Sequence, residues 1–321
     1  MIDRNLLRND PDLVKRSARA KRCVCGIEEW LELDSRMRAL SLEADGLRAQ
    51  RNSLSHRVSV LKKSGGDFRE AMEESRLAGE RIALLEAEMK NLEPRMTELV
   101  LAMPNIPDPD VPEGGEEANL EVSKWGGPPT FDFTPRPHWE LMKGVFDPEA
   151  AGVIAGSSFV LLRGWAAGLQ RRLIGWMVEN HLRAGMEEVW PPFLACRDSV
   201  TATGQLPKLA DDMYLLERDD LFLIPTGEVS ITNLYRGATL RESDLPVKLC
   251  GYTPCFRREA GSYGKDTRGL NRVHQFEKVE MVWLTHPEES HRAHEAMLAQ
   301  ATGLLEKLGL HYRVVLLAAG D

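Results

Sequence analysis

Two stretches of coiled-coil spacing, separated by a glycine turn, most limit how this chain can fold. Between residues 28 and 63, apolar residues recur at steps of four and three, with Arg51 filling one position: Leu33, Met37, Leu40, Ala44, Leu47, Leu54, Val58 and Leu61. After Ser64-Gly65-Gly66, a second set follows at Ala78, Ile82, Leu85, Met89, Leu92, Met96, Leu99 and Met103. Such spacing places apolar side chains along one stripe of a helix. It predicts an antiparallel helical hairpin that projects as an arm, within a first domain over residues 1–103. The alternative is a pair of core helices in a globular bundle.

Charge is distributed unevenly along the chain. The net charge of the 321 residues is −8, yet residues 1–63 hold 14 Lys and Arg against 9 Asp and Glu. A basic end on an acidic protein predicts a local contact with a polyanion. A solvated helix surface would have the same composition.

The cysteines and the apolar runs exclude several classes of protein. The five cysteines are odd in number and form no Cys-x-x-Cys pair, which fits reduced thiols in a cytoplasmic protein. His291 and His294 have helical spacing, but no neighbouring thiols or carboxylates complete a set, so no metal site is expected. The sequence contains no run of 18 apolar residues, so no membrane span is expected, and its first residues do not resemble a signal peptide.

The remaining residues predict a linker and a second domain. Residues 104–133 are rich in Pro, Gly and acids and are expected to be a linker. In the second domain, over 134–321, helices are expected at 164–184 and 288–308. Strands are expected at 187–193, 221–224, 254–258, 273–284 and 311–317. The fold class is therefore α+β: an N-terminal antiparallel coiled-coil hairpin, followed by a mixed, mainly antiparallel sheet.

Residues 256–280 contain the clearest chemical pattern. Alternation along a strand would place Arg257 and Glu259 on one face, and Phe276, Lys278 and Glu280 on one face of the return strand. Arginine can bind phosphate through two hydrogen bonds, and an aromatic ring can stack on a base. The pattern indicates a site for a nucleotide and a small amine. An ordinary hairpin with a surface ion pair is the alternative.

This segment resembles motif 2 of class II aminoacyl-tRNA synthetases, in the form that seryl-tRNA synthetases have. The resemblance continues at residues 103–107 (MPNIP), 204–208 (GQLPK), 211–214 (DDMY) and 224–228 (IPTGE), and it extends from Met1 to Asp321. The helix and strand expected over 164–193 resemble motif 1, which forms the dimer interface in that class. The resemblance implies a class II catalytic domain over 134–321, a homodimer and a cytoplasmic enzyme.

The resemblance also implies a reaction and its residues. Serine would be activated by ATP with Mg²⁺ and transferred to tRNA(Ser), while tRNA(Sec) as a further substrate stays open. Arg257 would be the catalytic residue. The implied ATP-binding residues are Arg257, Arg258, Glu259, Val273 and Phe276. The implied serine-binding residues are Thr226, Gly227, Glu228 and Glu280. Which carboxylate takes the serine ammonium stays open, and the loop residues Arg268 and Arg272 would reach the outer phosphates or the tRNA end.

On the arm, basic residues are candidates for contacts with tRNA phosphates. They are Arg36, Arg38, Arg48, Arg51 and Arg57.

The sequence departs from the family pattern in a few places. Gly227 stands where the family usually has alanine or serine, and it is expected to leave Thr226 and Glu228 in place. Asn271 replaces an apolar residue, and Ala318-Ala319 replaces a common Cys-Thr pair. The sequence looks like the N-terminal three quarters of a synthetase, because motif 3 is absent before Asp321. We expect this stretch alone to be weakly active or inactive.

Two other functions remain as alternatives. A non-catalytic RNA-binding protein would use the arm alone, which the set of Thr226, Glu228, Arg257, Glu259 and Glu280 opposes. An amino acid:carrier-protein ligase would need no long basic hairpin. Serine-dependent ATP–pyrophosphate exchange separates catalysis from simple RNA binding.

Overall fold

The computed structural model describes residues 2–260 and 269–321, so the candidate Arg268 lies outside the described residues. The chain divides into two compact units. The first is Met1–Leu120 with Leu316–Asp321, and the second is Glu121–Val315.

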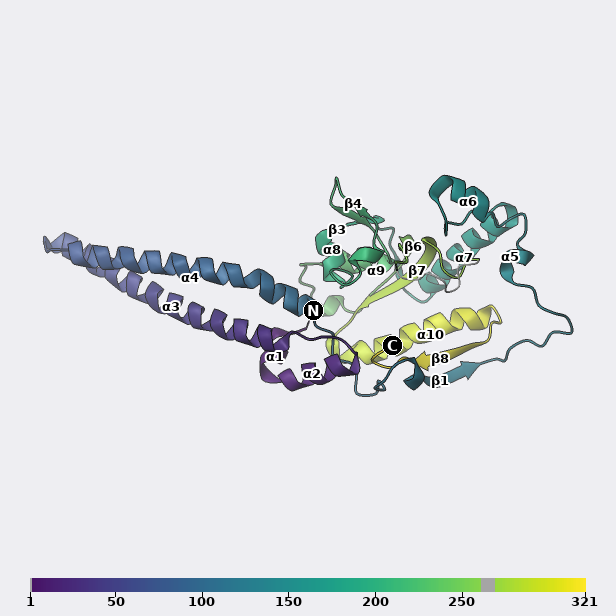
Figure 1. Cartoon of the computed structure of the whole chain (residues 1–321), viewed down its shortest axis with the longest axis horizontal. Helices are drawn as coiled ribbons and strands as arrows, with labels where there is room; N and C mark the ends of the chain where they lie inside the picture. Colours follow the sequence, from purple (N-terminus) through teal and green to yellow (C-terminus); the bar gives the residue numbers. More distant parts are fainter. Residues whose placement is uncertain (1, 261–268) are drawn as a thin grey trace. The chain divides into compact units, whose positions relative to one another are not determined.

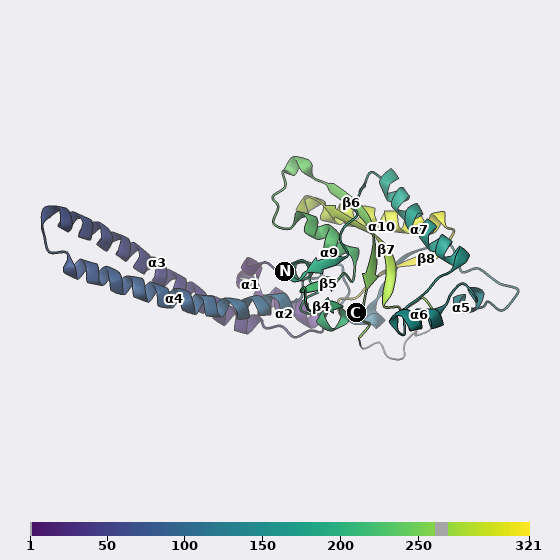
Figure 2. The ribbon, with the colours of Figure 1, turned by 90° about the horizontal axis from the view of Figure 1, so that it is seen from above.

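A long antiparallel hairpin dominates the first unit, as the coiled-coil spacing predicts. Helices α3 (Ile27–Ser64) and α4 (Arg69–Ala102) lie side by side along their length (Figures 1 and 2). Gly65 ends α3 with a positive φ of 71°, and its amide donates to the carbonyl of Leu61. A left-handed residue at this position favours glycine. Between the helices, the seam is buried at Ala44, Leu54, Ala78, Ile82 and Leu85.

Ion pairs join the two helices outside the seam. They are Arg95–Glu29 at 2.7 Å, Arg81–Glu43 at 2.8 Å, Arg48–Glu86 at 2.6 Å and Arg36–Glu88 at 2.5 Å. Each pair is partly solvated and contributes little stability alone. Their main consequence is that they favour one register of α3 against α4.

Two short helices that the sequence analysis did not predict close the base of the hairpin. They are α1 (Arg4–Asn9) and α2 (Pro11–Ala20). Asp10 caps α2 by accepting a hydrogen bond from the amide of Leu13, and Pro11 opens the helix. This Asp-Pro start is a signal that could have identified α2. The core at the base consists of Leu7, Val14, Ile27, Trp30, Met96, Leu99, Val100 and Met103.

Part of the predicted linker is ordered against the last residues of the chain. The amides of Ala319 and Gly320 donate to the carbonyls of Pro112 and Gly114, both at 2.9 Å, and the short helix η1 (Glu116–Ala118) follows. A Cβ on Gly320 would lie 2.6 Å from the Gly114 carbonyl oxygen. Because Ala319 bonds only through its backbone amide, this contact does not depend on which side chain stands there.

In the second unit, a three-stranded sheet has the order β2-β6-β7. Strand β2 (Glu187–Glu188) pairs parallel with β6 (Val247–Phe256), and β6 pairs antiparallel with β7 (Gln275–Leu284). Helix α7 (Gly164–Arg183) lies against β6 and β7. The mixed, mainly antiparallel sheet and the preceding hairpin confirm the predicted fold class.

The strand bounds differ from the expectation at the motif. Strand β6 ends at Phe256, so Arg257, Arg258 and Glu259 follow the strand rather than forming part of it. The amide of Arg258 donates to the carbonyl of Asp212, and Glu259 has a positive φ of 52°. These two features turn the chain away from β7. The strand expected over 187–193 is likewise reduced to β2.

A second sheet has the order β3-β5-β4 and is antiparallel throughout. Its strands are β3 (Leu194–Cys196), β4 (Leu215–Leu216) and β5 (Leu221–Leu223). Helices α8 (Arg197–Ala202) and α9 (Gly227–Thr232) lie against strands of this sheet. The core of this region contains Ala195, Val200, Leu206, Met213, Phe222, Ile224 and Val229.

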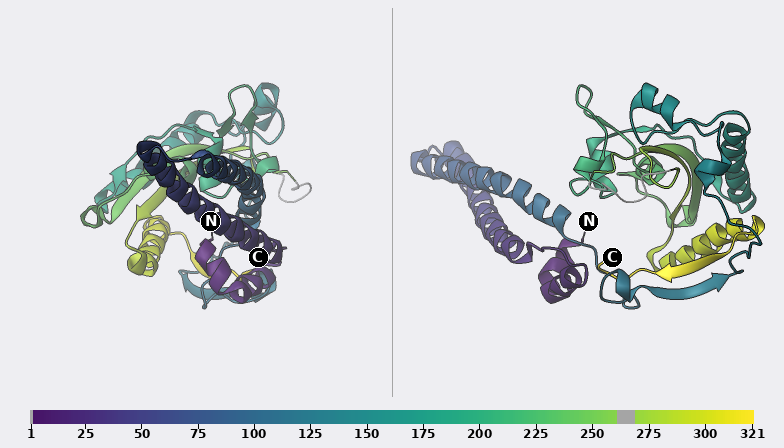
Figure 3. Two further views of the ribbon diagram at one scale, coloured as in Figure 1. Left: turned by 90° about the vertical axis from the view of Figure 1, so that its left-hand side faces the viewer. Right: turned by 45° about the vertical axis from the view of Figure 1, so that its right-hand side comes forward.

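The last strand, β8 (Tyr312–Leu316), pairs with β1 (Leu120–Trp125), which forms within the predicted linker. Trp125 stacks on Tyr312 with 6.1 Å between ring centres. Helix α10 (Ser290–Lys307) runs alongside β8 (Figures 1 and 3). The remaining elements are α5 (His138–Leu141), α6 (Pro148–Ala155), η2 (Ala210–Asp212), η3 (Asn233–Tyr235), η4 (Glu242–Asp244) and η5 (Pro287–Glu289). No helix in the described ranges has an apolar stretch long enough to cross a bilayer.

Candidate active site

The antiparallel pairing of β6 and β7 forms the floor of the candidate site. Thr253 pairs with Lys278 and Gly251 pairs with Glu280, so Lys278 and Glu280 share one face of β7, as alternation predicts. The start of α9 lies against the same two strands. Thr226, the residue before α9, is thereby brought to Glu280, which is 54 positions later in the sequence.

Around Glu280, the side chains of Thr226, Lys278 and Glu280 and the backbone amide of Glu228 form one hydrogen-bonded cluster. The Thr226 hydroxyl donates to Glu280 Oε2 at 2.8 Å and accepts from Lys278 Nζ at 2.7 Å. The backbone amide of Glu228 donates to the same Glu280 oxygen at 3.0 Å. Lys278 Nζ lies 3.2 Å from that oxygen. The structure therefore brings Thr226, Glu228 and Glu280 together and adds Lys278, to which the sequence analysis gave no role.

The two carboxylates of the cluster have unequal surroundings. Loss of hydration raises the pKa of Glu228, the charge of Glu280 raises it further, and the charge of Lys278 opposes the shift. Glu280 Oε2 instead accepts hydrogen bonds from the Thr226 hydroxyl and from the Glu228 backbone amide. Glu280 can therefore hold one cation, and the charges around Glu228 influence whether its carboxyl group is ionised.

Gly227 has a steric reason to be glycine. A Cβ built there would lie 2.9 Å from Thr253 Oγ1 and 3.3 Å from Glu280 Oε2. Thr253 is fully buried, and its hydroxyl lies 3.5 Å from Cys255 Sγ. Gly227 therefore permits a close approach of the backbone to β6 and keeps Thr226 and Glu228 on either side of Glu280.

The predicted nucleotide side of the site lies just beyond the end of β6. The Arg257 guanidinium carbon is 5.1 Å from the centre of the Phe276 ring, and Arg257 Nε donates to the Pro225 carbonyl at 3.3 Å. Val273, which precedes Phe276 by three positions in the sequence, is buried. Arg257 therefore lies beside the segment that carries Thr226, and an anion at its guanidinium would be close to the carboxylate cluster.

Arg258 and Glu259 face different partners from Arg257. The Arg258 guanidinium carbon lies 5.7 Å from the Tyr214 ring centre, and Glu259 pairs with Arg272 at 3.2 Å. Asp212 connects residues 211–214 (DDMY) to the turn after β6, because its carboxylate accepts a hydrogen bond from the Ala260 amide at 2.7 Å. The DDMY segment thus supports the turn after β6. In the sequence, this segment contributes to the family resemblance, and no separate role is predicted for it.

The five candidate arm residues divide into two groups. Arg36, Arg38 and Arg48 already pair with acids of the hairpin: Glu88, Asp34 and, for Arg48, both Asp45 and Glu86. Arg51 and Arg57 are exposed and form no ion pair within residues 2–260 and 269–321. These two are therefore the candidates most available to a phosphate.

Nothing among the described residues forms a cluster of three or more His, Cys, Asp or Glu that could hold a metal ion. All five cysteines are free, and Cys250 and Cys255 are buried. Burial raises the pKa of the Cys250 thiol to about 11. The two buried thiols therefore serve as packing groups.

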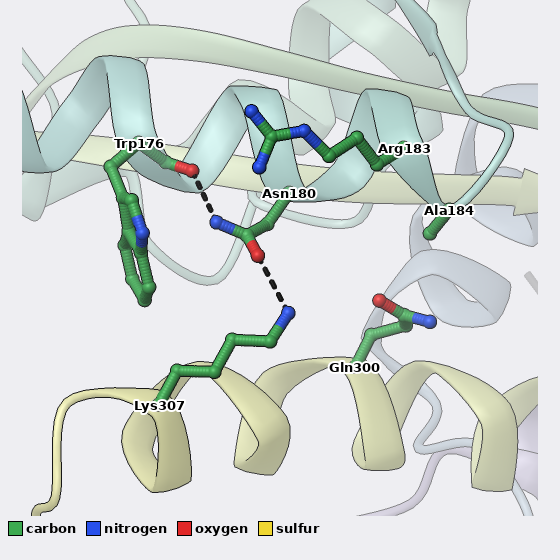
Figure 4. A pocket seen from close by; sticks show the side chains of 6 residues that line it. All are labelled: Trp176, Asn180, Arg183, Ala184, Gln300 and Lys307. Carbon is green, nitrogen blue, oxygen red and sulfur yellow. Dashed lines mark hydrogen bonds between the residues drawn. The ribbon is translucent and has the colours of Figure 1, made fainter.

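A cavity of about 500 Å³ lies between α7 and α10 (Figure 4), and none of the residues that line it belongs to the carboxylate cluster. It is lined by Trp176, Asn180, Arg183, Ala184, Gln300 and Lys307. The Asn180 amide donates to the Trp176 carbonyl at 2.7 Å and accepts from Lys307 Nζ at 2.6 Å. Because both polar groups of the Asn180 side chain already have hydrogen-bond partners, we interpret this cavity as a packing gap where α7 meets α10.

Comparisons with known proteins match both units. The family model of the seryl-tRNA synthetase N-terminal domain matches residues 1–107, and the tRNA synthetase class II core domain (G, H, P, S and T) matches 214–321. Serine–tRNA ligase of Thermotoga neapolitana is 46% identical over 328 aligned residues, which cover 100% of this chain and 77% of that protein.

Solved structures give the same match. Seryl-tRNA synthetase from Pyrococcus horikoshii, complexed with ATP, has a TM-score of 0.92 and 31% identity, over 100% of this chain and 78% of that one. Cytoplasmic serine–tRNA ligase from Naegleria fowleri, in complex with AMP, has a TM-score of 0.85 and 25% identity, over 100% of this chain and 79% of that one.

Proposed function

Because the chain belongs to the seryl-tRNA synthetase family, a family of ATP-dependent class II aminoacyl-tRNA synthetases, we propose that it activates L-serine with ATP and transfers the seryl group to tRNA(Ser). The observation that supports this most is the carboxylate cluster of Thr226, Glu228 and Glu280 beside Arg257. The solved relatives with ATP and AMP support a nucleotide as the second ligand.

In the proposed reaction, a serine carboxylate oxygen attacks the α-phosphorus of ATP and pyrophosphate leaves. Both reactants are anionic, so the site must offset their charge and hold them in line. Arg257 supplies the positive charge next to the serine-binding segment. Phe276 and Val273 would border the adenine, and Arg258 and Glu259 would complete the contact with the nucleotide.

Recognition of serine requires partners for an ammonium group and for a hydroxyl group. The Glu280 carboxylate and the Thr226 hydroxyl are the acceptors that converge in the cluster. The backbone amide of Glu228 lies at the same point, and its carboxylate, which is within range of the charges of Glu280 and Lys278, can serve as a further acceptor. A pocket that bonds the substrate hydroxyl discriminates strongly against alanine, because its polar groups would be left unpaired.

Magnesium would accompany ATP in this proposal. The described residues present no ready cluster of metal ligands, which fits an ion held mainly by phosphates and water, since Mg²⁺ typically keeps several waters. When bound, the ion offsets phosphate charge. The residues of this chain would position the α-phosphate and the serine.

The arm is the proposed tRNA-binding element. Arg51 and Arg57 have no acidic partner among the described residues and face solvent, so they can meet phosphates at little cost. Charging assays with tRNA(Ser) and tRNA(Sec) transcripts would decide whether the second is also a substrate.

We also propose a cytoplasmic homodimer, whose interface includes α7 and the segment after β2. Large apolar side chains are exposed there, with Trp165 at 58% and Trp190 at 70% exposure. Such exposure is typical of a surface that a partner covers. Light scattering coupled to size-exclusion chromatography would test this: a monomer at micromolar concentration would contradict it.

The proposed assignment of the serine pocket is tested by steady-state pyrophosphate exchange. Glu280→Gln and Thr226→Ala should raise the KM for serine by about tenfold or more, the loss expected for about 1.4 kcal/mol of binding, with little change for ATP. Glu277→Gln is the matched control, because Glu277 lies on the other face of β7 and bonds to Tyr252. Equal effects on both substrates would contradict the assignment.

A further inference from the structure

Lys278 occupies the point where the acceptors of the proposed serine pocket converge. Its Nζ lies 2.7 Å from Thr226 Oγ1 and 3.2 Å from Glu280 Oε2. The side chain comes from β7, two residues before Glu280, and is 30% exposed, while that of Glu280 is 20% exposed. The ammonium of Lys278 is thus held inside the site by the same oxygens that could bind a ligand ammonium.

The acceptors have little spare capacity while Lys278 is there. The Thr226 hydroxyl donates its proton to Glu280 and accepts from Lys278, and a hydroxyl has only one further lone pair. Glu280 Oε2 already faces Thr226, Lys278 and the Glu228 amide. A second ammonium could not share these two atoms without displacing the first.

The charges in the pocket also indicate that Lys278 would compete with a ligand ammonium. Two carboxylates, Glu228 and Glu280, lie within range of one ammonium, that of Lys278. Lys278 therefore satisfies much of the attraction that a ligand ammonium would otherwise meet. A lysine is suited to moving aside, because its charge sits on a flexible four-carbon stem.

We propose that Lys278 is an internal competitor for the substrate ammonium: it occupies the ammonium position of the proposed serine pocket and must swing away before an amino acid binds. The proposal rests on the proposed function, because it takes the cluster to be the amino-acid pocket. A lysine that stays in place and contacts the substrate carboxylate would instead leave serinol binding unchanged on its removal and would weaken the binding of L-serine.

The test is calorimetric titration of the full chain with L-serine and with serinol, which keeps the ammonium and hydroxyl groups and lacks the carboxylate. Lys278→Met and Lys278→Gln remove the competing ammonium, and Lys278→Arg retains a cation. Lys248→Met is the control on the neighbouring strand, because Lys248 lies over Trp283, with 4.2 Å from its Nζ to the ring centre. Two neutral variants are included so that the comparison survives if one of them fails to fold.

We expect Lys278→Met or Lys278→Gln to bind serinol about tenfold more tightly than the unchanged chain, a factor equal to about 1.4 kcal/mol. Lys278→Arg and Lys248→Met should bind it as the unchanged chain does. Weaker or unchanged serinol binding in the folded neutral variants would overturn the competitor role. Failure of the unchanged chain to bind L-serine would instead overturn the proposed function, and this inference with it.

Discussion

At the scale of single residues, Glu280 connects the groups of the candidate site, because its Oε2 meets the Thr226 hydroxyl, the Glu228 amide and the Lys278 ammonium. Thr226, Glu228 and Glu280 could be named because each lies in a recognisable motif, and they do form one cluster. Lys278 received no role, because alternation predicts the face of a strand and not the partner a flexible side chain will reach. Nor could the sequence explain Gly227, whose contact with Thr253 exists only in the folded sheet.

Arg257 gives the sharpest prediction at this scale. Arg257→Ala should lower kcat/KM for adenylate formation by about 10- to 150-fold, because a charge-assisted hydrogen bond contributes about 1.5–3 kcal/mol. Pyrophosphate exchange measures the loss, and circular dichroism checks the fold. Arg241→Ala is the matched control, since Arg241 pairs only locally with Asp244. Exchange within twofold of the unchanged chain would refute the assignment of Arg257.

At the scale of elements, long periodic segments were predicted well and short ones were not. The spacing of α3 and α4 repeats over many turns, so it outweighs local exceptions such as Arg51. Helices α1 and α2 are too short to show a period, and β1 lies in a segment whose prolines and glycines favoured a linker. The end of β6 was misplaced because the positive φ of Glu259 cannot be read from a glutamate.

The base of the hairpin contains an ion pair that should make stability depend on pH. Arg8 donates to both oxygens of Asp34, at 2.9 and 2.7 Å, and Asp34 is buried. The hydrogen bond from Arg8 is the main cause that lowers the pKa of Asp34. A carboxyl whose pKa is lowered on folding stabilises the protein above its unfolded pKa, about 3.9, and that contribution is lost as the pH falls through the folded value.

Asp34→Asn should therefore reduce the free energy of unfolding at pH 7 by about 1–3 kcal/mol, less than for a fully buried pair because Arg8 is partly solvated. Urea denaturation at pH 7 and near pH 3 measures the effect, and the difference from the unchanged chain should shrink at the lower pH. Asp12→Asn, at an exposed position of α2, should have little effect at either pH. A constant difference across this range would contradict the pair's role.

The arm can be tested as an element without disturbing its base. Excision of residues 45–79, with a short glycine linker from Ala44 to Glu80, leaves Ile27, Trp30 and Met96 in their core. Adenylate formation should be spared, while charging of tRNA(Ser) should be lost. Unchanged charging would assign the arm a purely structural role.

Point substitutions refine that test. Arg51→Ala and Arg57→Ala should each weaken tRNA binding and reduce the slope of log affinity against log salt by about 1, as loss of one phosphate contact would. Arg76→Ala is the matched control, because Arg76 pairs with Glu73 and Glu80 on the same arm. Filter binding across a salt series measures the slopes, and equal slopes for all three variants would argue against phosphate contacts at Arg51 and Arg57.

At the scale of the whole molecule, each unit has its own match: the N-terminal family model lies in the first and the class II core model covers the cluster in the second. RNA binding is proposed for the first unit and serine activation for the second. The central claim concerns the second unit, because the family's reaction begins with activation.

The measurement that tests this claim most directly is exchange of labelled pyrophosphate into ATP by the chain, with single amino acids supplied in turn. The account predicts exchange, however slow, that requires L-serine. L-Alanine should be rejected by a factor of about 10⁴, because it leaves the hydroxyl-binding groups unpaired. Exchange that proceeds equally with L-alanine, or that requires another amino acid in place of L-serine, would contradict the account.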